Sequence, residues 1–191
     1  MFKIRDVRQL RLLVSPVRQA ILDVLEGTRD CPVAELARVL NRPADALYYH
    51  LRLMERAGLL VEKRGRGERA CKAYGLRRRG TVLEYQPSSK SNASAVTRIV
   101  ASMLRDASRS FRRAYAPGET LRGPQRTLWA GRRMGWLTAE QVGRLNAKIS
   151  QISRLLEKGT KHSPKSRLFA FTHVFCPYER TVPESQRTNK I

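Results

Sequence analysis

The clearest alternation of apolar and polar positions lies in residues 32–60, PVAELARVLNRPADALYYHLRLMERAGLL. One set of apolar residues at helical spacing predicts a short helix: Val33, Leu36, Ala37 and Leu40. Residues 41–43 interrupt the pattern, and a second apolar stripe then predicts a second helix: Leu47, Leu51 and Met54, with Gly58 where a left-handed cap belongs. Two short helices about a tight turn predict a helix-turn-helix motif.

The residues that follow predict a two-stranded hairpin. A strand is expected to begin at residues 59–61, and Gly65-Arg66-Gly67 supplies a turn. Residues 69–76, RACKAYGL, return as the second strand, and Val82 and Leu83 are candidates to extend the same sheet. A helix-turn-helix followed directly by a basic hairpin predicts a winged helix.

Amphipathic helices are predicted on both sides of this motif. Residues 3–14 and 16–27 precede it, and Ser15 and Pro16 mark the start of the second of these helices. The other two predicted helices are residues 95–115 and residues 138–158, the latter opened by a capping box of Thr138 and Gln141. Strand patterns in residues 126–137 and 167–175 flank the last helix. The predicted fold class is therefore α+β, mainly helical, with a winged helix-turn-helix domain, a helix and a small strand-helix-strand C-terminal unit.

A stretch of linker composition divides the chain. We expect a winged helix-turn-helix DNA-binding domain in residues 1–85, a linker in 86–94, a C-terminal dimerisation or sensing domain in 95–179 and a flexible tail in 180–191. The wide apolar stripe of the helix in this C-terminal domain needs a partner, and a symmetry mate is preferred over the unit that follows. The expected dimer contacts are Ile99, Met103 and Phe111.

The run YYHLRLMERAGLL at residues 48–60, preceded by VAELARVLNRPADAL, resembles the recognition helix of the ArsR-like winged-helix transcriptional regulators. The resemblance spans roughly residues 8–78, with helix, turn, His-Leu pair, Ala-Gly-Leu cap and wing in the same order. It implies a homodimeric, sequence-specific DNA binder. The metal sensors of that family carry a paired-cysteine ELCVC-type segment in the helix before the turn, whereas this chain offers only Cys31 there. The resemblance therefore points to the non-metal-sensing type.

The charge balance narrows the classes of function. The 191 residues include 38 Lys and Arg against 16 Asp and Glu, which gives a formal net charge of +22. Such a field attracts polyanions, and nucleic acid is a better candidate than an anionic membrane surface. No apolar run approaches the ~20 residues that would span a membrane. Three scattered cysteines, Cys31, Cys71 and Cys176, predict no disulfide framework, so we expect a cytoplasmic, nucleoid-associated protein.

Residues that contact DNA are expected on the second helix of the motif, opposite its apolar stripe. The candidates are Arg42, Asp45, Tyr48, Tyr49, Arg52 and Arg56. Consecutive tyrosines lie about 100° apart on a helix and cannot both be core, although Tyr48 could pack at the rim of the core. Arg52 suits either a bidentate contact to guanine or a phosphate contact, and the sequence leaves both open. His50 adjoins the apolar face and is interpreted as a structural histidine, hydrogen-bonded within the fold or to backbone phosphate, rather than as a metal ligand or catalytic base.

The predicted wing supplies a second set of cations. Its candidate DNA-binding residues are Lys63, Arg64, Arg66, Arg69 and Lys72, and they outnumber Glu62 and Glu68. These cations predict contact with phosphates or with the minor groove. The alternative is that a charged hairpin only protects an exposed sheet edge.

An enzymatic function has little support in the sequence. The chain has no phosphate-binding Gly-Lys-Ser/Thr loop, no H-E-x-x-H motif and no convincing nucleophile–base pair, so no catalytic residue, cofactor or metal site is predicted. The aromatic row of Phe169, Phe171 and Phe175 is interpreted as core rather than as a ligand box.

The preferred hypothesis is a homodimeric transcriptional regulator that binds double-stranded DNA at a pseudo-palindromic site, with an effector for the C-terminal unit left open. A basic winged-helix protein that binds RNA or the ribosome is the alternative, favoured by arginines spread through residues 98–133. A third hypothesis is a protein-binding winged helix whose charge meets an acidic partner.

Overall fold

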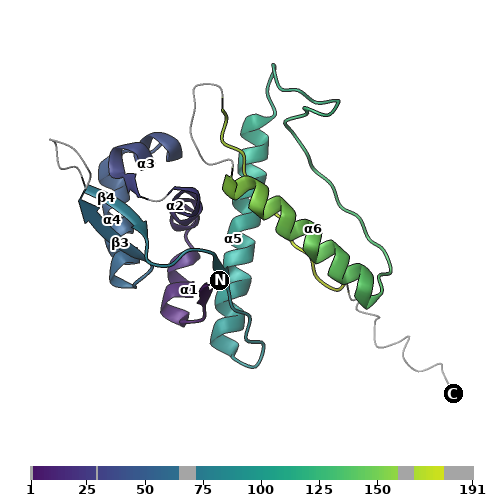
Figure 1. Ribbon diagram of the computed structural model, residues 1–191, viewed down its shortest axis with the longest axis horizontal. Coiled ribbons are helices and arrows are strands. Elements are labelled where there is room, and N and C mark those ends of the chain that lie inside the picture. The colour runs from purple at the N-terminus through teal and green to yellow at the C-terminus, as the bar shows by residue number, and fades with distance from the viewer. Residues whose placement is uncertain (1, 29, 65–71, 159–165, 179–191) are drawn as a thin grey trace.

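The computed structural model describes residues 2–28, 30–64, 72–158 and 166–178 (Figure 1). The elements follow the chain in this order: β1 (Phe2–Ile4), α1 (Val7–Leu13), α2 (Pro16–Gly27), β2 (Cys31–Pro32), α3 (Val33–Leu40), α4 (Ala44–Arg56), β3 (Leu60–Arg64), β4 (Lys72–Leu76), β5 (Thr81–Leu83), α5 (Lys90–Ala114) and α6 (Ala139–Lys158). The predicted fold class, α+β and mainly helical with a winged helix first, is confirmed.

The helix-turn-helix is formed by α3 and α4, and the local chemistry explains both of its breaks. Asn41 ends α3 in the left-handed conformation with φ of +48°, which asparagine tolerates better than most residues. At the far end of α4, Gly58 has φ of +73°. Its N–H donates to the Glu55 carbonyl at 2.8 Å, and the N–H of Leu59 donates to the Met54 carbonyl at 2.9 Å. This is the Schellman arrangement, and it confirms the predicted cap.

The wing is a three-stranded antiparallel sheet in the order β2-β4-β3. The register pairs Leu60 with Leu76 at the base and Arg64 with Lys72 at the end nearest the tip. The predicted turn at residues 65–67 lies outside the described residues.

Two expectations about the N-terminal region were wrong. Residues 3 and 4, predicted as the start of a helix, belong instead to β1, which pairs in parallel with β5 in a separate two-stranded sheet. Val82 and Leu83 therefore do not extend the wing. Helix α1 starts only at Val7 because Asp6 acts as its N-cap, accepting from the N–H of Arg8 at 2.8 Å. Ile4 and Val7 are three residues apart, which is a helical spacing, so the sequence pattern did not reveal that the helix begins only at Val7.

The hydrophobic core surrounds α2, which packs against α1, α3, α4, α5, α6 and β4. Its fully buried members come from β1, the four helices α1 to α4 and the wing strands: Ile4, Leu10, Ile21, Leu25, Cys31, Leu36, Leu47, Leu51, Met54, Leu60 and Tyr74. Burying each large aliphatic side chain contributes about 1.5–3 kcal/mol relative to leaving it exposed. This shared core fixes the orientation of α4.

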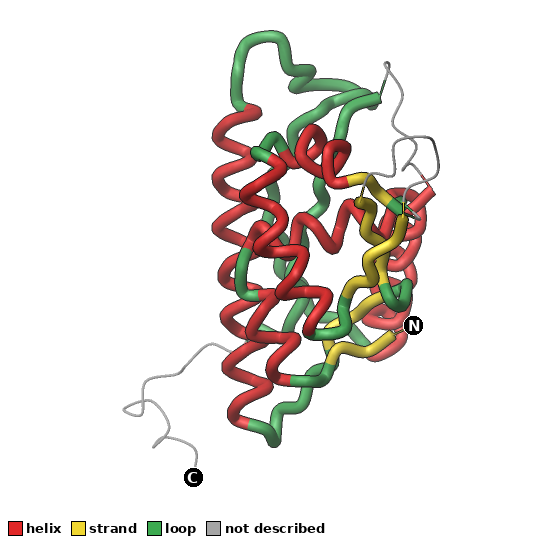
Figure 2. The backbone as a smooth tube through the Cα atoms, turned by 90° about the vertical axis from the view of Figure 1, so that its left-hand side faces the viewer, coloured by secondary structure: helices red, strands yellow, loops and turns green. Residues whose placement is uncertain are grey.

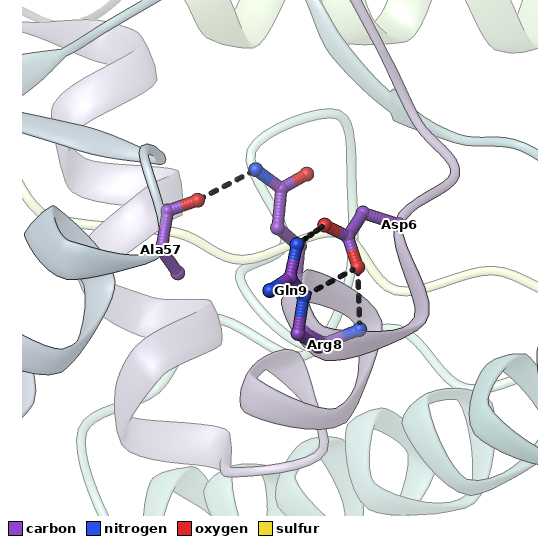
Figure 3. A network of polar contacts seen from close by, with 4 residues as sticks. All are labelled: Asp6, Arg8, Gln9 and Ala57. Carbon is purple, nitrogen blue, oxygen red and sulfur yellow. Dashed lines mark hydrogen bonds and ion pairs between the residues drawn. The ribbon is translucent and has the colours of Figure 1, made fainter.

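A polar contact adds to that positioning at the C-terminal end of α4. The side-chain amide of Gln9 on α1 donates from Nε2 to the carbonyl of Ala57 at 2.7 Å (Figure 3). Ala57 is the capping residue of α4. The bond therefore attaches α1 to the end of the helix that carries the candidate DNA-binding residues.

Helix α5 begins at Lys90, inside the stretch whose composition suggested a linker. The junction is fixed by Asn92, which is only 1% exposed. Its Oδ1 accepts from the N–H of Gln86 at 2.9 Å, and its Nδ2 donates to the Glu84 carbonyl at 3.1 Å. Ala95, Val96 and Ile99 then bury the first half of α5 in the N-terminal core. The proposed division into domains stays a prediction.

The C-terminal part contains α6 but not the two predicted strands. The capping box of α6 is confirmed, with the Thr138 N–H donating to Gln141 Oε1 at 2.8 Å and the Gln141 N–H donating to Thr138 Oγ1 at 3.3 Å. Residues 126–137 and 167–175 are loop rather than strand (Figure 2). An alternation of apolar and polar residues defines one apolar face of a strand. A strand also needs a neighbouring strand for its backbone hydrogen bonds, and neither segment pairs with described residues. The predicted tail, 180–191, lies outside the described residues.

No helix in the described part of the chain combines the length and apolar character needed to cross a bilayer.

Candidate nucleic-acid interface

The outer face of α4 presents a row of polar side chains to solvent. Asp45, Tyr49, Arg52 and Arg56 follow one another at steps of four, three and four residues, which places them on one face of a helix. All four are exposed, and the Tyr49 side chain is 66% exposed. We call these four residues the α4 row. Arg42, in the turn before α4, is exposed as well.

Tyr48 lies differently from its neighbour. It is half-buried and packs against the hydrophobic core, beside apolar residues of the same helix. The rim position considered for Tyr48 therefore describes its location, whereas Tyr49 points away from the core. A buried stripe and an exposed row on opposite faces are what a helix needs to sit on a core and present side chains to a partner.

Two of the wing cations form ion pairs within the sheet. Lys63 contacts Asp30 at 2.6 Å, and Lys72 contacts Glu62 at 3.0 Å. The hydrogen bond from Lys72 is the main reason that the pKa of Glu62 lies below its usual range. Tyr74 also donates to Glu62, at 3.2 Å. Since these pairs are exposed, they are weak and exchangeable for phosphate contacts.

The remaining wing candidates cannot be placed in the same way. Arg64 ends β3, and its side chain lies outside the described residues, as do Arg66 and Arg69.

The basic run after β4 fastens the wing to α2. The guanidinium of Arg79 donates to the carbonyls of Glu26 and Thr28, and the Arg78 guanidinium lies 5.3 Å from the centre of the Phe2 ring. The Glu26 carboxylate accepts from the N–H groups of Gly80 and Thr81 at 3.1 and 2.9 Å. These contacts hold the base of the wing, at the opposite end of the sheet from its tip.

The structure adds Arg18 to the residues near the interface, and it changes the interpretation of His50. Arg18 lies in the first turn of α2, where a surface arginine gives no sequence signal. Its Nε and the Nδ1 of His50 on α4 are both buried without a hydrogen-bond partner. A hydrogen bond of His50 within the fold or to backbone phosphate was expected, and at Nδ1 no bond within the fold exists among the described residues.

The described residues contain no group of His, Cys, Asp or Glu arranged to hold a metal ion. Burial raises the pKa of the Cys31 thiol to about 12, and the nearby Glu35 carboxylate acts in the same direction. Because the thiolate is the form that binds metals, Cys31 is a poor ligand at neutral pH.

The predicted dimer contacts occupy three different environments. Ile99 is 4% exposed and belongs to the core of its own chain, Met103 is half-buried, and Phe111 is 38% exposed. Phe111 stacks on Tyr115 one turn later, with ring centres 6.2 Å apart.

The aromatic row expected in the core of the C-terminal unit is instead at the surface. Phe169, Phe171 and Phe175 are each exposed by about half or slightly less. The expectation was wrong for this chain because no second layer among the described residues covers the row.

The comparisons with known proteins agree with the geometry of the N-terminal region. Residues 13–63 match the model of a family described as a helix-turn-helix domain. These residues form a helix-turn-helix domain. The match runs from the last residue of α1 through α2, β2, α3 and α4 into β3.

Solved structures similar to this chain include a transcriptional regulator homologue from Pyrococcus horikoshii OT3. It is 20% identical, with 52% of this chain and 87% of that chain covered and a TM-score of 0.33. Another is the adhesin competence repressor from Streptococcus pyogenes, 13% identical, with 75% and 82% covered and a TM-score of 0.31. TM-scores of this size do not establish a shared overall fold. No curated protein matches the chain.

Proposed function

We propose that this protein is a DNA-binding transcriptional regulator, a winged-helix homodimer of the ArsR-like, non-metal-sensing type. The observation that carries the proposal is the exposed α4 row on the outer face of a helix-turn-helix, in a chain with a net charge of +22. Figure 1 shows α3, α4 and the wing on one side of α5 and α6 on the other, so the second half of the chain leaves this face open.

The dimensions of α4 suit the major groove. Its 13 residues extend over roughly 20 Å at about 1.5 Å per residue. A major groove about 12 Å wide admits one helix and presents a distinct hydrogen-bond pattern for each base pair. Arg52 would read guanine or bind a phosphate, Asp45 would accept from the amino group of cytosine, and Tyr49 would contact a phosphate or a base edge.

Phosphate neutralisation should dominate the affinity. Arg42 at the front of α4 and the cations of the wing are placed on either side of the α4 row in the chain. For a duplex, log K falls with log salt by ~0.9 for each phosphate contacted. A steep salt dependence is therefore part of the proposal.

A second copy of this chain is the proposed partner of the apolar surface in the C-terminal half. Leu104, Phe111 and Tyr115 are exposed along the second half of α5, and Leu145 and Leu156 are exposed on α6. Monomeric proteins rarely leave contiguous apolar patches larger than a few hundred Å² uncovered. Two-fold pairing through Met103 and Phe111 would place two α4 helices on half-sites about one helical turn apart, or a multiple of it.

The dimer is tested by substituting Phe111 with arginine. We expect wild-type protein to sediment as a dimer at micromolar concentration and F111R to sediment as a folded monomer. Arg52→Ala, on the opposite side of the molecule, is the matched control and should remain dimeric. A monomeric wild type, or a dimeric F111R, would contradict pairing through this surface.

The DNA-binding function is tested by selecting bound sequences from a random duplex pool. We expect enrichment of a pseudo-palindromic motif, and loss of that enrichment when Tyr49 and Arg52 are both replaced by alanine. Equal binding to random and selected duplex by the wild type would contradict sequence-specific recognition.

A second candidate function is RNA binding, and one observation favours it. In residues 122–133, Arg122, Arg126, Arg132 and Arg133 are exposed without an acidic residue between them. The Arg126 guanidinium lies 3.6 Å from the centre of the exposed Trp129 ring. Basic groups interleaved with aromatic rings are typical of surfaces that stack unpaired bases.

Competition separates the two functions. The chain has two tryptophans, Trp129 and Trp136, so intrinsic tryptophan fluorescence reports on this segment alone. We expect the selected duplex to outcompete structured RNA at physiological salt without quenching the tryptophans. Strong quenching by RNA, with the duplex displaced, would favour the RNA-binding function.

A further inference from the structure

Three basic side chains that interact electrostatically lie next to the α4 row. Arg18 comes from the first turn of α2, Arg42 from the turn before α4, and His50 from α4 itself. The Nε of Arg18 and the Nδ1 of His50 are buried, and neither has a hydrogen-bond partner. Buried polar groups without a partner are rare in folded proteins and call for a physical explanation.

The charges that act on His50 in this cluster are positive. Burial is the main reason that the pKa of His50 lies below its usual range, and the positive charges of Arg18 and then Arg42 lower it further. Burial also lowers the pKa of Arg18, and among its described neighbours Tyr49 is the group that opposes this change. The cluster therefore holds positive charge in a partly desolvated place.

Among the described residues, the groups that shift the pKa of His50 include no carboxylate. Helix α4 packs against α1, α2, α3 and β3. From α2 comes Arg18, and from the α3–α4 turn comes Arg42, and both positive charges oppose protonation of His50. On α4 itself, the Tyr49 ring meets the imidazole edge to face at 5.5 Å between centres.

An anion with acceptor oxygens would satisfy both features at once. After these side chains turn toward it, it would accept from the Arg18 guanidinium and, once the imidazole is protonated, from His50, and it would balance their positive charge. Tyr49 belongs to the α4 row and adjoins His50, while Arg42 is exposed at the front of the same helix. The cluster thus borders the proposed DNA-binding face, where the nearest anion in a complex is a backbone phosphate.

We propose that Arg18, Arg42 and His50 form a binding site for one phosphate of the DNA backbone, and that His50 takes up a proton when this phosphate binds. This inference rests on the proposed DNA-binding function and adds a site and a pH dependence to it. The proton comes from the buffer and is held by the imidazole, so that both ring nitrogens become donors. The phosphodiester remains a monoanion.

Proton uptake makes affinity depend on pH with a defined sign. In the complex the phosphate raises the pKa of His50, whereas in free protein its cationic neighbours and burial hold it below the usual value. The added affinity is therefore present at low pH and is lost as pH rises through the pKa of the complex. A one-unit difference between the two pKa values corresponds to about tenfold in affinity.

The test is the affinity for the selected duplex between about pH 5.5 and 8 at constant salt, together with calorimetry in two buffers of different ionisation enthalpy. For the wild type we expect affinity to rise about tenfold as pH falls, with uptake approaching one proton per protomer. His50→Gln should bind with nearly pH-independent affinity and without proton uptake. Arg18→Gln should bind more weakly at every pH.

His173→Gln is the matched control, because His173 is an exposed histidine that stacks on Phe171 in the C-terminal half. It should keep the wild-type pH dependence and proton uptake. If His50→Gln fails to fold, NMR titration of the imidazole in wild-type protein gives the same information. The pKa of His50 must then be higher with the duplex bound than without it.

The outcomes separate this inference from the function on which it rests. Duplex binding that is pH-independent in the wild type, or equally pH-dependent in His50→Gln, would overturn the phosphate site and leave DNA binding intact. No duplex binding at any pH would overturn the proposed function itself.

Discussion

The N-terminal and C-terminal halves of this chain bury their apolar residues to very different degrees. In the winged helix, large aliphatic side chains from six helices and strands meet around α2 and are almost completely inaccessible. Beyond Tyr115, comparable residues such as Trp136, Leu155 and Leu168 are largely exposed. Both halves carry clear amphipathic patterns. The difference shows that a periodic pattern defines an apolar face, whereas burial requires a second surface that faces it.

The largest expected effect contrasts one leucine from each half. Leu51 is fully buried in the core beneath α4, and Leu155 on α6 is 72% exposed. Leu51→Ala should lower the free energy of unfolding by about 2–5 kcal/mol through lost burial and the cavity that remains. Leu155→Ala should change it by less than about 0.5 kcal/mol. Chemical denaturation of both variants, followed by far-UV circular dichroism, measures the contrast. Equal losses would show that α6 is buried in solution.

The next effect concerns the junction between the halves. Asn92→Ala removes the amide that bonds to Gln86 and Glu84 and leaves their partly buried backbone groups unpaired. We expect a loss of about 1–3 kcal/mol. Hydrogen exchange should show faster exchange at the start of α5 while the amides of α2 remain protected. Uniform destabilisation across the chain would indicate that α5 and the winged helix unfold as one unit.

Within the winged helix, the outer face of α4 should affect binding rather than stability. Arg52→Ala should relax preference at one base position by about 1–3 kcal/mol if the guanidinium reads guanine. Arg42→Ala should weaken binding to all duplexes and reduce the salt slope by ~0.9. Binding of cognate and random duplex across salt concentrations distinguishes these results. If Arg52→Ala weakens both duplexes equally, it contacts only phosphate.

The smallest expected effect is a pH dependence of stability where α2 approaches α5. The protein atoms around Asp23, and then the carboxylates of Glu26 and Asp106, raise its pKa from 3.8 to about 6. Asp23 therefore stabilises the fold at acidic pH, and this contribution is lost as pH rises through about 6. The side chain keeps solvent access, so the effect is small.

Asp23→Asn tests this effect. It should raise Tm by no more than a few degrees above pH 7 and leave it nearly unchanged near pH 4. A rise that is the same at both pH values would assign the change to something other than ionisation of Asp23.

Local chemistry explains why parts of the fold could be predicted from the sequence. The break at Asn41, the cap at Gly58 and the capping box of α6 each depend on residues within a few positions of one another. Such signals are present in the chain itself. The α4 row followed from the same logic, because an apolar stripe on a helix determines which residues face away from it.

Long-range pairing explains most of what the sequence did not reveal. Strands β1 and β5 have three residues each and lie almost eighty positions apart, which is too short for a periodic signal and too distant for a local one. Arg18 approaches His50 only after α2 packs against α4. The prediction of strands at residues 126–137 and 167–175 was wrong although the local alternation of apolar and polar residues is present. Neither segment has a neighbouring strand among the described residues.

The segment between the wing and α5 is held at both ends. The Glu26 carboxylate accepts hydrogen bonds from the N–H groups of Gly80 and Thr81. The Asn92 side chain accepts from the N–H of Gln86 and donates to the carbonyl of Glu84. Because both ends of this segment are hydrogen-bonded, a displacement of α5 should move the segment as a rigid connection rather than deform it. A displacement of α5 should therefore reach the wing as a rotation of its base, without local unfolding in between.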